Sequence, residues 1–379
     1  MAGAPHLQPD QARARAYARA RLRLSLASTA VELAALVIFL GTGASVALAR
    51  FWERHSAGSP WFVVLAYTAI AGFGLKLVGL PFDLCSRRLE IAFELNRQSG
   101  RSWWGDQAKG LLIGGGLALA GVELVYWLLR AQPERWWLWA WAGFTAFVVV
   151  LAQLAPVILM PLFYKFRPLR EDDEREAELR RRLERLCERA GTRVRGCFEW
   201  QLGTRTVKAN AALTGWGPTR RIIVSDTLLA DAPAEEIEAV LAHELGHHVH
   251  HDIWNGLALQ AALSFFGFWL VNRVLLALAP SLHLTGIADI AGLPLLVLVA
   301  SVLSLLLLPA ANAFTRALER RADDYSFAAM GSAEPLIAGL ERLAARNLAE
   351  HEPPRWKEIL FYSHPAIATR IRRARAWRP

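Results

Sequence analysis

Apolar residues gather in six long runs along the chain, and shorter polar stretches separate them. The runs cover residues 24–49, 61–84, 110–129, 136–164, 253–279 and 287–314. Each is at least as long as the roughly 20 residues that a helix needs to cross the hydrocarbon core of a bilayer. The fifth run is the weakest, because Asn255, Gln260, Asn272 and Arg273 interrupt it. We therefore predict about six transmembrane helices.

The first run also has two marks of a cleaved signal peptide. Arginines precede it, and Ala47, Leu48 and Ala49 resemble a cleavage site. A signal peptide has an apolar core of roughly 7 to 15 residues, whereas this run is longer and contains Glu32. We expect the run to remain in the protein as its first span.

Between the fourth and fifth runs the pattern changes to that of a small α+β module. Residues 171–190 are rich in charged residues, but Leu179, Leu183 and Leu186 recur at helical spacing and predict an amphipathic helix. Glycines and prolines then separate three short stretches that are typical of strands. These stretches are residues 193–200, 206–217 and 220–229.

A second amphipathic helix follows at residues 234–250 and opens after Asp231 or Pro233. No glycine or proline lies between His247 and Trp254. We therefore expect this helix to continue directly into the fifth span.

Composition agrees with a membrane protein rather than an ordinary soluble one. Hydrophobic residues make up 54% of the 379 residues, and the mean hydropathy is +0.24. The three cysteines, Cys85, Cys187 and Cys197, show no CxxC spacing. We expect neither a disulfide framework nor a thiolate zinc site.

The net charge of +9 follows the predicted topology. The leader of residues 1–23 holds five arginines, the loop after the second run holds five basic residues, and residues 165–221 hold fifteen. The alternate loops hold only Arg50, Arg54, Arg130 and Arg135. Loops rich in basic residues stay in the cytoplasm, so we expect both termini and the module to be cytoplasmic. With no finger motif or interleaved aromatic platform, we expect no nucleic-acid partner.

The stretch LAHELGHHVHHD, residues 241–252, contains the candidate chemistry. His243 and His247 lie four residues apart, so a helix projects both imidazoles from one face toward one metal ion. Glu244 lies beside them and can reach a bound water. This is the HExxH pattern of zinc peptidases, in which zinc lowers the pKa of its bound water to about 7. Glu244 would take the proton from that water and pass it to the leaving amine.

The other three histidines of this stretch are poor candidates for ligands. His251 would lie about 12 Å along the helix axis from His243, which is too far for one shared metal. His248 and His250 point elsewhere on a helix. We expect all three to be polar or interfacial residues.

A third ligand is expected beyond the last apolar run. Glu319 and Asp323 lie four residues apart, so one carboxylate can complete the metal site while the other accepts a hydrogen bond from a ligating histidine. The alternative is an ordinary surface helix, in which these acids pair with Arg316, Arg320 or another neighbouring arginine. The presence of HExxH favours the metal site.

These residues resemble the M48 zinc metallopeptidases, and within them the type I CAAX prenyl proteases. The resemblance rests on HELGH at 243–247 and on Glu319 followed by Ala322 and Asp323. It extends to NAALTGWGPTRRIIVSDTLL, to YSHPAIATRI near the C-terminus, and to LPFDL, FELNRQS and DQAKGLL in the N-terminal half. It covers about residues 24–373.

The resemblance implies one zinc ion (Zn2+) per chain, held by His243, His247 and Glu319. It implies that Glu244 is the general base and that Asp323 orients a ligating histidine. In this family the zinc lies in a chamber that the transmembrane helices form and the soluble domain closes.

Two further residues are assigned by resemblance alone. Asn210 matches the asparagine of a strand beside the substrate, and His364 matches a histidine that steadies the oxyanion. Judged by their own surroundings in the sequence, Asn210 also suits a turn, and His364 suits a loop before Pro365. Eukaryotic members that process prenylated proteins usually have a seventh span and a different C-terminal tail, whereas we count six spans in this sequence.

The expected fold class is a polytopic α-helical membrane protein with a small α+β, zincin-like (gluzincin) catalytic module. Its expected parts are a basic cytoplasmic leader, an N-terminal membrane domain, the α+β region with the HExxH helix, two further spans and a C-terminal helical part. These parts cover residues 1–23, 24–164, 165–252, 253–314 and 315–379.

The expected function is that of a zinc metalloendopeptidase of CAAX prenyl protease type, acting on a membrane-associated peptide or protein substrate. The use of Arg, Ala and Leu is typical of a high-GC prokaryote, so we expect a place in the inner membrane with the site facing the cytoplasm. A heat-shock-type M48 quality-control protease and a non-catalytic metal-binding scaffold are the alternatives. The six spans and the loops FELNRQS and DQAKGLL favour the CAAX type over the heat-shock type. An intact Glu244 argues against a scaffold.

Overall fold

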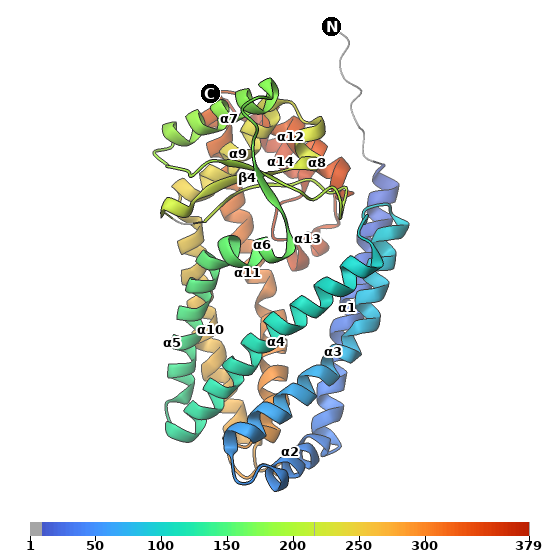
Figure 1. Ribbon diagram of the computed structural model, residues 1–379, viewed down its shortest axis with the longest axis vertical. Helices are drawn as coiled ribbons and strands as arrows, with labels where there is room; N and C mark the ends of the chain where they lie inside the picture. Colours follow the sequence, from blue (N-terminus) through green and yellow to red (C-terminus); the bar gives the residue numbers. More distant parts are fainter. Residues whose placement is uncertain (1–9, 216, 379) are drawn as a thin grey trace.

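The computed structural model describes residues 10–215 and 217–378. Long helices form one end of an elongated molecule, and a mixed module with the C-terminal helices forms the other (Figure 1). Six segments of the described residues are long and apolar enough to cross a membrane. They are α1 (Gln11–Gly41), α3 (Pro60–Ala92), α4 (Gly100–Ala131), the segment Trp136–Phe163, α10 (Asp252–Leu278) and the segment Ile290–Met330, which contains α11 (Leu293–Met330). The prediction of six spans is confirmed.

The first span differs from the predicted run at both ends. Asp10 caps α1 by accepting a hydrogen bond from the backbone N–H of Arg13 at 3.0 Å, so the basic leader is helical from Gln11 onward. The helix ends at Gly41, because Gly43 has a φ of 75°, which glycine adopts readily. The prediction of one span over residues 24–49 is wrong, since α2 (Ala44–His55) is a separate short helix.

The fourth span changes its geometry near its second end. α5 (Trp136–Leu154) passes into a π-helical turn, Ala155–Leu159, and then into α6 (Met160–Phe163). Pro156 and Pro161 lie in this stretch, and a proline offers no N–H to the helical hydrogen bonds. The chain leaves the membrane bundle here and enters the module.

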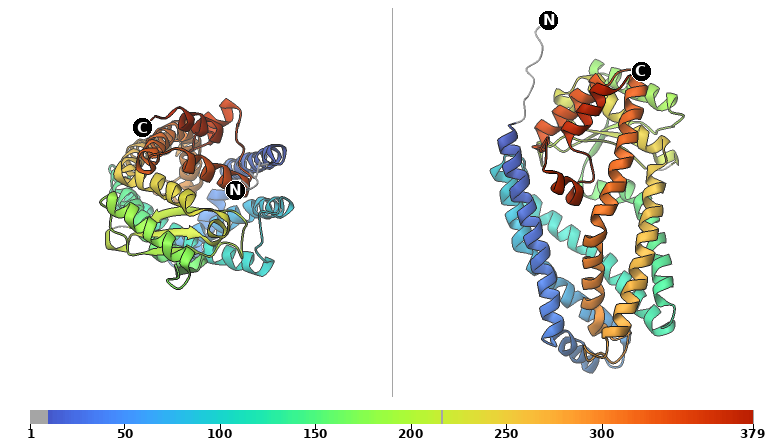
Figure 2. Two further views of the ribbon diagram at one scale, coloured as in Figure 1. Left: turned by 90° about the horizontal axis from the view of Figure 1, so that it is seen from above. Right: turned by 180° about the vertical axis from the view of Figure 1, so that it is seen from behind.

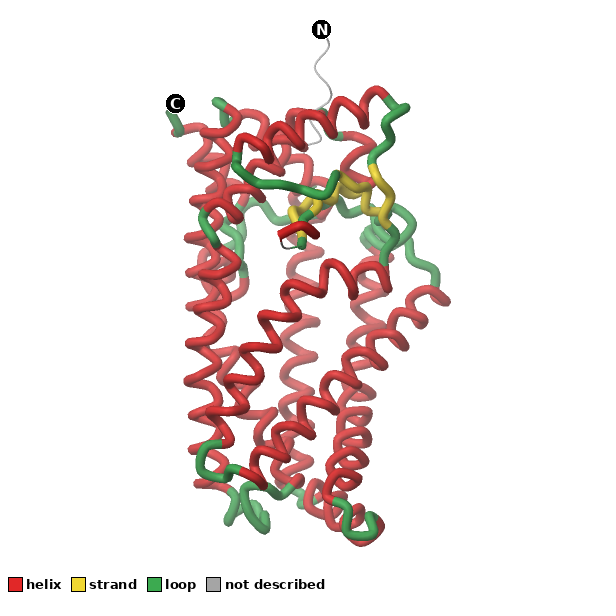
Figure 3. The backbone as a smooth tube through the Cα atoms, turned by 60° about the vertical axis from the view of Figure 1, so that its left-hand side comes forward, coloured by secondary structure: helices red, strands yellow, loops and turns green. Residues whose placement is uncertain are grey.

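Four short strands form the sheet of the module, in the order β1-β2-β4-β3. The inner strands β2 (Cys197–Trp200) and β4 (Arg221–Ser225) are parallel, and the outer strands β1 (Phe166–Pro168) and β3 (Ala211–Thr214) pair antiparallel to them. All three predicted strands are present but shorter than expected, and β1 was not predicted. Figure 3 shows that the strands are confined to this end of the molecule.

The third predicted stretch contains a helix as well as a strand. The hydroxyl of Ser225 accepts a hydrogen bond from the backbone N–H of Leu228 and so begins α8 (Asp226–Asp231). Before the sheet, α7 (Glu174–Arg189) buries its predicted leucine stripe in the core of the module. The leucines Leu179, Leu183 and Leu186 are at most 3% exposed.

The helix with the HExxH sequence, α9 (Ala234–Val249), does not continue into the fifth span. His251 has a φ of 57°, and a left-handed residue interrupts a right-handed helix. The prediction of one continuous helix is wrong, although the residue at the break is neither glycine nor proline. The break lets α10 start a new direction at Asp252.

By contrast, α11 runs unbroken from the membrane bundle into the module (Figure 1), across the expected boundary at residues 314 and 315. It packs against α9 at Gly246, where an added Cβ would lie 2.9 Å from the Cα of Ala322. Glycine is the residue that allows so close an approach. This contact brings Glu319 and Asp323 against the HExxH helix.

Three helices complete the C-terminal part: α12 (Glu334–Asn347), α13 (Arg355–Phe361) and α14 (Ile367–Ala376). α12 packs against α9, and α13 is held to α11 by hydrogen bonds from Asn312 to the carbonyl of Leu360 and from Arg316 to the carbonyl of Tyr362. Figure 2 shows this part beside the first turns of α1.

Candidate metal centre

Three side chains from two helices converge where α9 and α11 meet. His243 and His247 come from α9 and Glu319 comes from α11, and their ligand atoms lie within 4.8 Å of one another. His243 Nε2 is 3.4 Å from Glu319 Oε2, and His247 Nε2 is 3.4 Å from Glu319 Oε1. The structure thus brings together the three residues that the sequence analysis selected as ligands.

The donor set fits a divalent metal ion. Two imidazoles and one carboxylate leave a fourth position open, as in catalytic zinc sites. His243 is 6% exposed and Glu319 is 3% exposed. The Oε2 atom of Glu319 is buried, and its nearest polar neighbours are histidine ring nitrogens, His364 Nδ1 at 2.8 Å and His243 Nε2 at 3.4 Å. A buried carboxylate among imidazole nitrogens is an arrangement that a shared cation would satisfy.

Two more carboxylates hold the histidine rings in this orientation. Asp323 Oδ1 lies 3.0 Å from His243 Nδ1, and Asp252 Oδ2 lies 3.0 Å from His247 Nδ1. With each Nδ1 occupied in this way, the Nε2 atoms face Glu319. Asp323 was expected in this position, whereas Asp252 was missed. The only signal in the sequence was that Asp252 is an acid two residues before Trp254. On the expected continuous helix, Asp252 would have pointed away from His247.

Each of these carboxylates also pairs with an arginine. Arg370 on α14 donates from Nε and Nη2 to the two oxygens of Asp323, at 3.0 and 2.6 Å, and Arg321 on α11 donates to Asp252. Arg370 is 8% exposed, and its Nη1 lies 3.8 Å from Glu319 Oε2. Neither arginine was predicted from the sequence, because nothing marks them among the basic residues around them.

The charges of this group change the pKa values of its histidines. Burial lowers the pKa of His243, but hydrogen bonds with Asp323 and Glu319 outweigh burial and raise it to about 9. The pKa of His247 is also raised, because its contacts with Glu319 and Asp252 outweigh burial and the charge of His243. Protons therefore compete with a metal for these nitrogens, and metal binding weakens as the pH falls.

Glu244 is half-buried on the same helix, between the two histidines. Burial raises the pKa of its carboxyl above the usual value, although nearby His243 and His247 act in the opposite direction. A carboxyl with a raised pKa is suited to take up a proton and release it again near neutral pH.

Of the two residues assigned by resemblance alone, the structure brings one to the cluster. His364 lies in the loop between α13 and α14, with Nδ1 2.8 Å from Glu319 Oε2 and 63% of its side chain exposed. Asn210 directly precedes β3, where its backbone N–H donates to Ser225 Oγ at 2.9 Å. No hydrogen bond of the described residues links the Asn210 side chain to the three ligands.

The remaining histidines of the stretch are not part of the group of three. The rings of His250 and Tyr325 meet edge to face with centroids 6.1 Å apart, and His251 is exposed at the turn between α9 and α10. Burial lowers the pKa of His248.

Two family models cover most of the chain. Residues 173–378 match peptidase family M48, and residues 5–165 match the model described as CAAX prenyl protease N-terminal, five membrane helices. In that region the structure has the helices α1 to α5, of which the short α2 is not among the candidate spans.

Several curated proteins are similar along most of the chain. The uncharacterized metalloprotease YhfN of Bacillus subtilis is 30% identical, over 89% of this chain and 79% of the relative. The probable CAAX prenyl protease 1 of Schizosaccharomyces pombe is 28% identical, over 81% of this chain and 65% of the relative. The CAAX prenyl protease 1 homolog of Oryza sativa is 29% identical, over 81% and 72%.

The fold also matches a solved structure, the crystal structure of S. mikatae Ste24p. The TM-score is 0.83 at 23% sequence identity, and the match covers 95% of this chain and 87% of that chain. The M48 model alone spans more than half of the 379 residues and contains the converging His and Glu side chains. The chain therefore belongs to peptidase family M48 and is a multi-pass membrane metalloendopeptidase.

Proposed function

We propose that this protein is a zinc-dependent endopeptidase of the CAAX prenyl protease type, which cuts membrane-associated peptides near their C-terminus. The observation that carries the proposal is the convergence of His243 and His247 on α9 with Glu319 on α11, the helix that continues from the membrane bundle. The names of the relatives from Schizosaccharomyces pombe and Oryza sativa support the type of protease.

In this proposal His243, His247 and Glu319 hold one zinc ion per chain. When bound, zinc would act as a Lewis acid toward a water molecule and the substrate carbonyl. Asp323 and Asp252 keep each imidazole in the tautomer that leaves Nε2 free to bind metal. Arg370 balances the negative charge that Asp323 adds to this buried group.

Glu244 acts as the general base. It accepts a proton from the attacking water and passes it to the amine nitrogen of the leaving peptide, for which its raised pKa is suited. His364 donates a hydrogen bond to the substrate carbonyl oxygen, which becomes negative as water attacks, since the exposed His364 ring lies beside Glu319. Asn210, directly before the outer strand β3, binds the substrate backbone.

The substrate reaches the site from the bilayer or from the cytoplasm. The basic loop between α3 and α4 lies at the module's end of the molecule. Arg205 of the module pairs with Asp106 on α4, and Lys208 of the module pairs with Glu90 on α3. Basic loops favour a cytoplasmic location, so the site would face the cytoplasm, at the inner membrane of a prokaryote. A peptide with a prenyl group on a cysteine near its C-terminus is the substrate class that we propose.

A Glu244→Gln variant tests the proposal. The amide keeps the shape of the side chain but accepts no proton, so hydrolysis should fall by about 10² to 10⁴-fold while zinc content stays the same. Purified protein in detergent would be assayed with a farnesylated C-terminal peptide and with the same peptide lacking the farnesyl group. The farnesylated peptide should be cut faster.

The matched control is Glu235→Gln, because Glu235 lies exposed in the first turn of the same helix. It should retain full activity. Near-normal hydrolysis by the Glu244→Gln variant would refute the role of Glu244. Equal rates on both peptides would refute prenyl recognition and leave a less selective protease. The match to the CAAX protease N-terminal model favours the first type over a heat-shock-type protease.

A further inference from the structure

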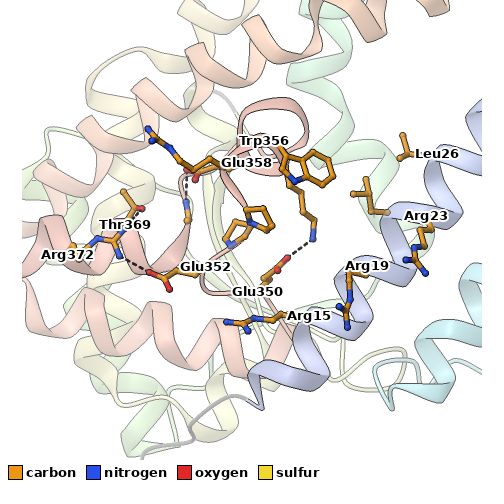
Figure 4. Close-up of a pocket in the computed structure, with 16 residues that line it drawn as sticks. Arg15, Arg19, Arg23, Leu26, Glu350, Glu352, Trp356, Glu358, Thr369 and Arg372 are labelled. Atoms are coloured by element: carbon orange, nitrogen blue, oxygen red, sulfur yellow. Dashed lines mark hydrogen bonds and ion pairs between the residues drawn. The ribbon is translucent and has the colours of Figure 1, made fainter.

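A cleft of about 1120 Å3 lies between the first turns of α1 and the C-terminal segment around α13 and α14 (Figure 4). One face of α1 forms the first wall, with residues at helical spacing: Arg15, Arg19, Leu22, Arg23 and Leu26. The opposite wall comes from residues 350–372, including Trp356 and Arg372. None of the side chains in the metal centre lines this cleft.

The cleft has more positive charge than its own acids balance. Six basic side chains and three carboxylates line it. The three carboxylates already have partners: Glu350 pairs with Lys357, Glu352 pairs with Arg372, and Glu358 accepts a hydrogen bond from the backbone N–H of Ala366.

Four guanidinium groups therefore remain available. The side chains of Arg15, Arg19, Arg23 and Arg355 form neither a hydrogen bond nor an ion pair with any residue in the described ranges 10–215 and 217–378, and all four are exposed. Guanidinium groups bind the oxygens of carboxylates and phosphates with two parallel hydrogen bonds. The cleft thus offers donors for an anion that the protein itself does not supply.

The position of these arginines along α1 sets their depth relative to the bilayer. The apolar run of α1 starts at Leu24, directly after Arg23. At a rise of about 1.5 Å per residue, Arg19 lies about 6 Å and Arg15 about 12 Å beyond Arg23. The headgroup layer on each side of a bilayer is roughly 5–8 Å thick. Arg23 and Arg19 therefore lie at headgroup depth, and the backbone of Arg15 lies beyond the outer edge of that layer.

The helix α13, which gives Trp356 to the opposite wall, carries exposed apolar residues. Trp356 is 56% exposed, and outside the cleft Ile359 is 51% exposed and Leu360 is 37% exposed. Such a group is unfavourable in water but is typical of a helix that rests in the interface, where tryptophan is enriched. Leu22 and Leu26 provide apolar surface on the α1 side.

We infer that this cleft binds an anionic phospholipid from the leaflet on the side of the catalytic module. The phosphate lies among Arg15, Arg19, Arg23 and Arg355, and an acyl chain follows Leu22 and Leu26 toward the hydrocarbon core. A free anion would use only the arginines, whereas a lipid uses both the arginines and the apolar surface. This inference does not depend on the proposed peptidase substrate.

The test compares two triple variants of the full-length protein in detergent. The cleft variant is Arg15→Gln, Arg19→Gln and Arg23→Gln. The matched control removes three exposed arginines at the same end of the bundle but outside the cleft, through Arg21→Gln, Arg88→Gln and Arg101→Gln. Native mass spectrometry would measure the binding of phosphatidylglycerol and of phosphatidylcholine to each protein.

The cleft variant should bind phosphatidylglycerol at least tenfold more weakly than the unmodified protein, since each basic residue near an anionic headgroup contributes on the order of fivefold. The control should change this affinity by less than about threefold, and phosphatidylcholine binding should not change. Arg355→Gln, on the opposite wall, should alone weaken phosphatidylglycerol binding several-fold without any effect on zinc content or thermal stability.

Three results would overturn the inference. Equal losses in the cleft variant and the control would show a general effect of surface charge. Displacement of phosphatidylglycerol by an equal concentration of inorganic phosphate would show a simple anion site. Displacement by an equal concentration of a short acidic peptide would show that the cleft takes a peptide.

Discussion

The carboxylate of Asp252 gives a sharp test of how the turn between α9 and α10 contributes to metal binding. Asp252 is 5% exposed, and its Oδ2 lies 3.0 Å from His247 Nδ1 while its Oδ1 accepts a hydrogen bond from Arg321. Replacing it with asparagine removes the negative charge but keeps the shape and one acceptor oxygen. Replacing it with alanine removes the contact with His247 altogether.

The expected size of the effect follows from these contacts. A partner that orients a metal-ligating histidine is generally worth about 10 to 100-fold in metal affinity. In Asp252→Asn the amide oxygen can still accept from Nδ1–H, so we expect a loss of about tenfold, which is about 1.4 kcal/mol. In Asp252→Ala the ring is released, so we expect a loss of about 100-fold, which is about 2.8 kcal/mol.

The assay is a competition for zinc between metal-free protein in detergent and a chromogenic chelator. Asp324→Asn is the matched control, because Asp324 pairs with Arg373 at the surface and has a side chain that is 52% exposed. Its zinc affinity should stay within about twofold of the unmodified protein. Unchanged zinc affinity in Asp252→Ala would show that the turn has no part in the metal centre.

Three further predictions concern the ligands, the helix contact and the topology. His247→Ala should remove the zinc from purified protein, as measured by atomic emission, whereas His251→Ala should keep it, because only the first offers a nitrogen to the group. Gly246→Ala should lower the midpoint of thermal unfolding through a clash worth about 1–3 kcal/mol, whereas Gly256→Ala, which meets nothing within 4 Å, should not. In a cysteine-free background of intact cells, a membrane-impermeant thiol reagent should label single cysteines at two of three exposed positions and spare the third. The labelled positions are Ala57 and Gln132, the protected one is Thr204, and the reverse result would mean that the module faces outward.

The local patterns of the chain were sufficient to predict the spans and the three converging side chains. Apolar runs of membrane length identify a helix without reference to any partner, and His243 and His247 lie on one helical face by their spacing alone. Glu319 could be selected because it is an acid on the helix that follows the last span. The structure shows that Glu319 and the last apolar run lie on one helix, α11.

The parts that sequence reasoning missed depend on backbone turns and on long-range partners. The left-handed conformation of His251 is unusual for a residue other than glycine, so the break before Asp252 had no local signal. Arg370 is one of several arginines in its helix, and only the packing of α14 against α11 shows that it is the one that meets Asp323. For the same reason, the contact of His364 with Glu319 required the three-dimensional structure.

The unbroken course of α11 also fixes the distance between the bilayer core and the metal centre. Glu319 lies five residues beyond Phe314, where the apolar run ends, so the metal centre stands about 8 Å above the hydrocarbon core. An extended peptide advances about 3.3–3.6 Å per residue. For a substrate anchored in the bilayer, roughly two or three residues therefore separate the anchor from the bond that is cut. The length of α11 beyond the apolar run thus sets the distance between the anchor and the cut for the proposed substrate class, and a peptide whose anchor lies much closer to that bond would have to lift the anchor toward the headgroups.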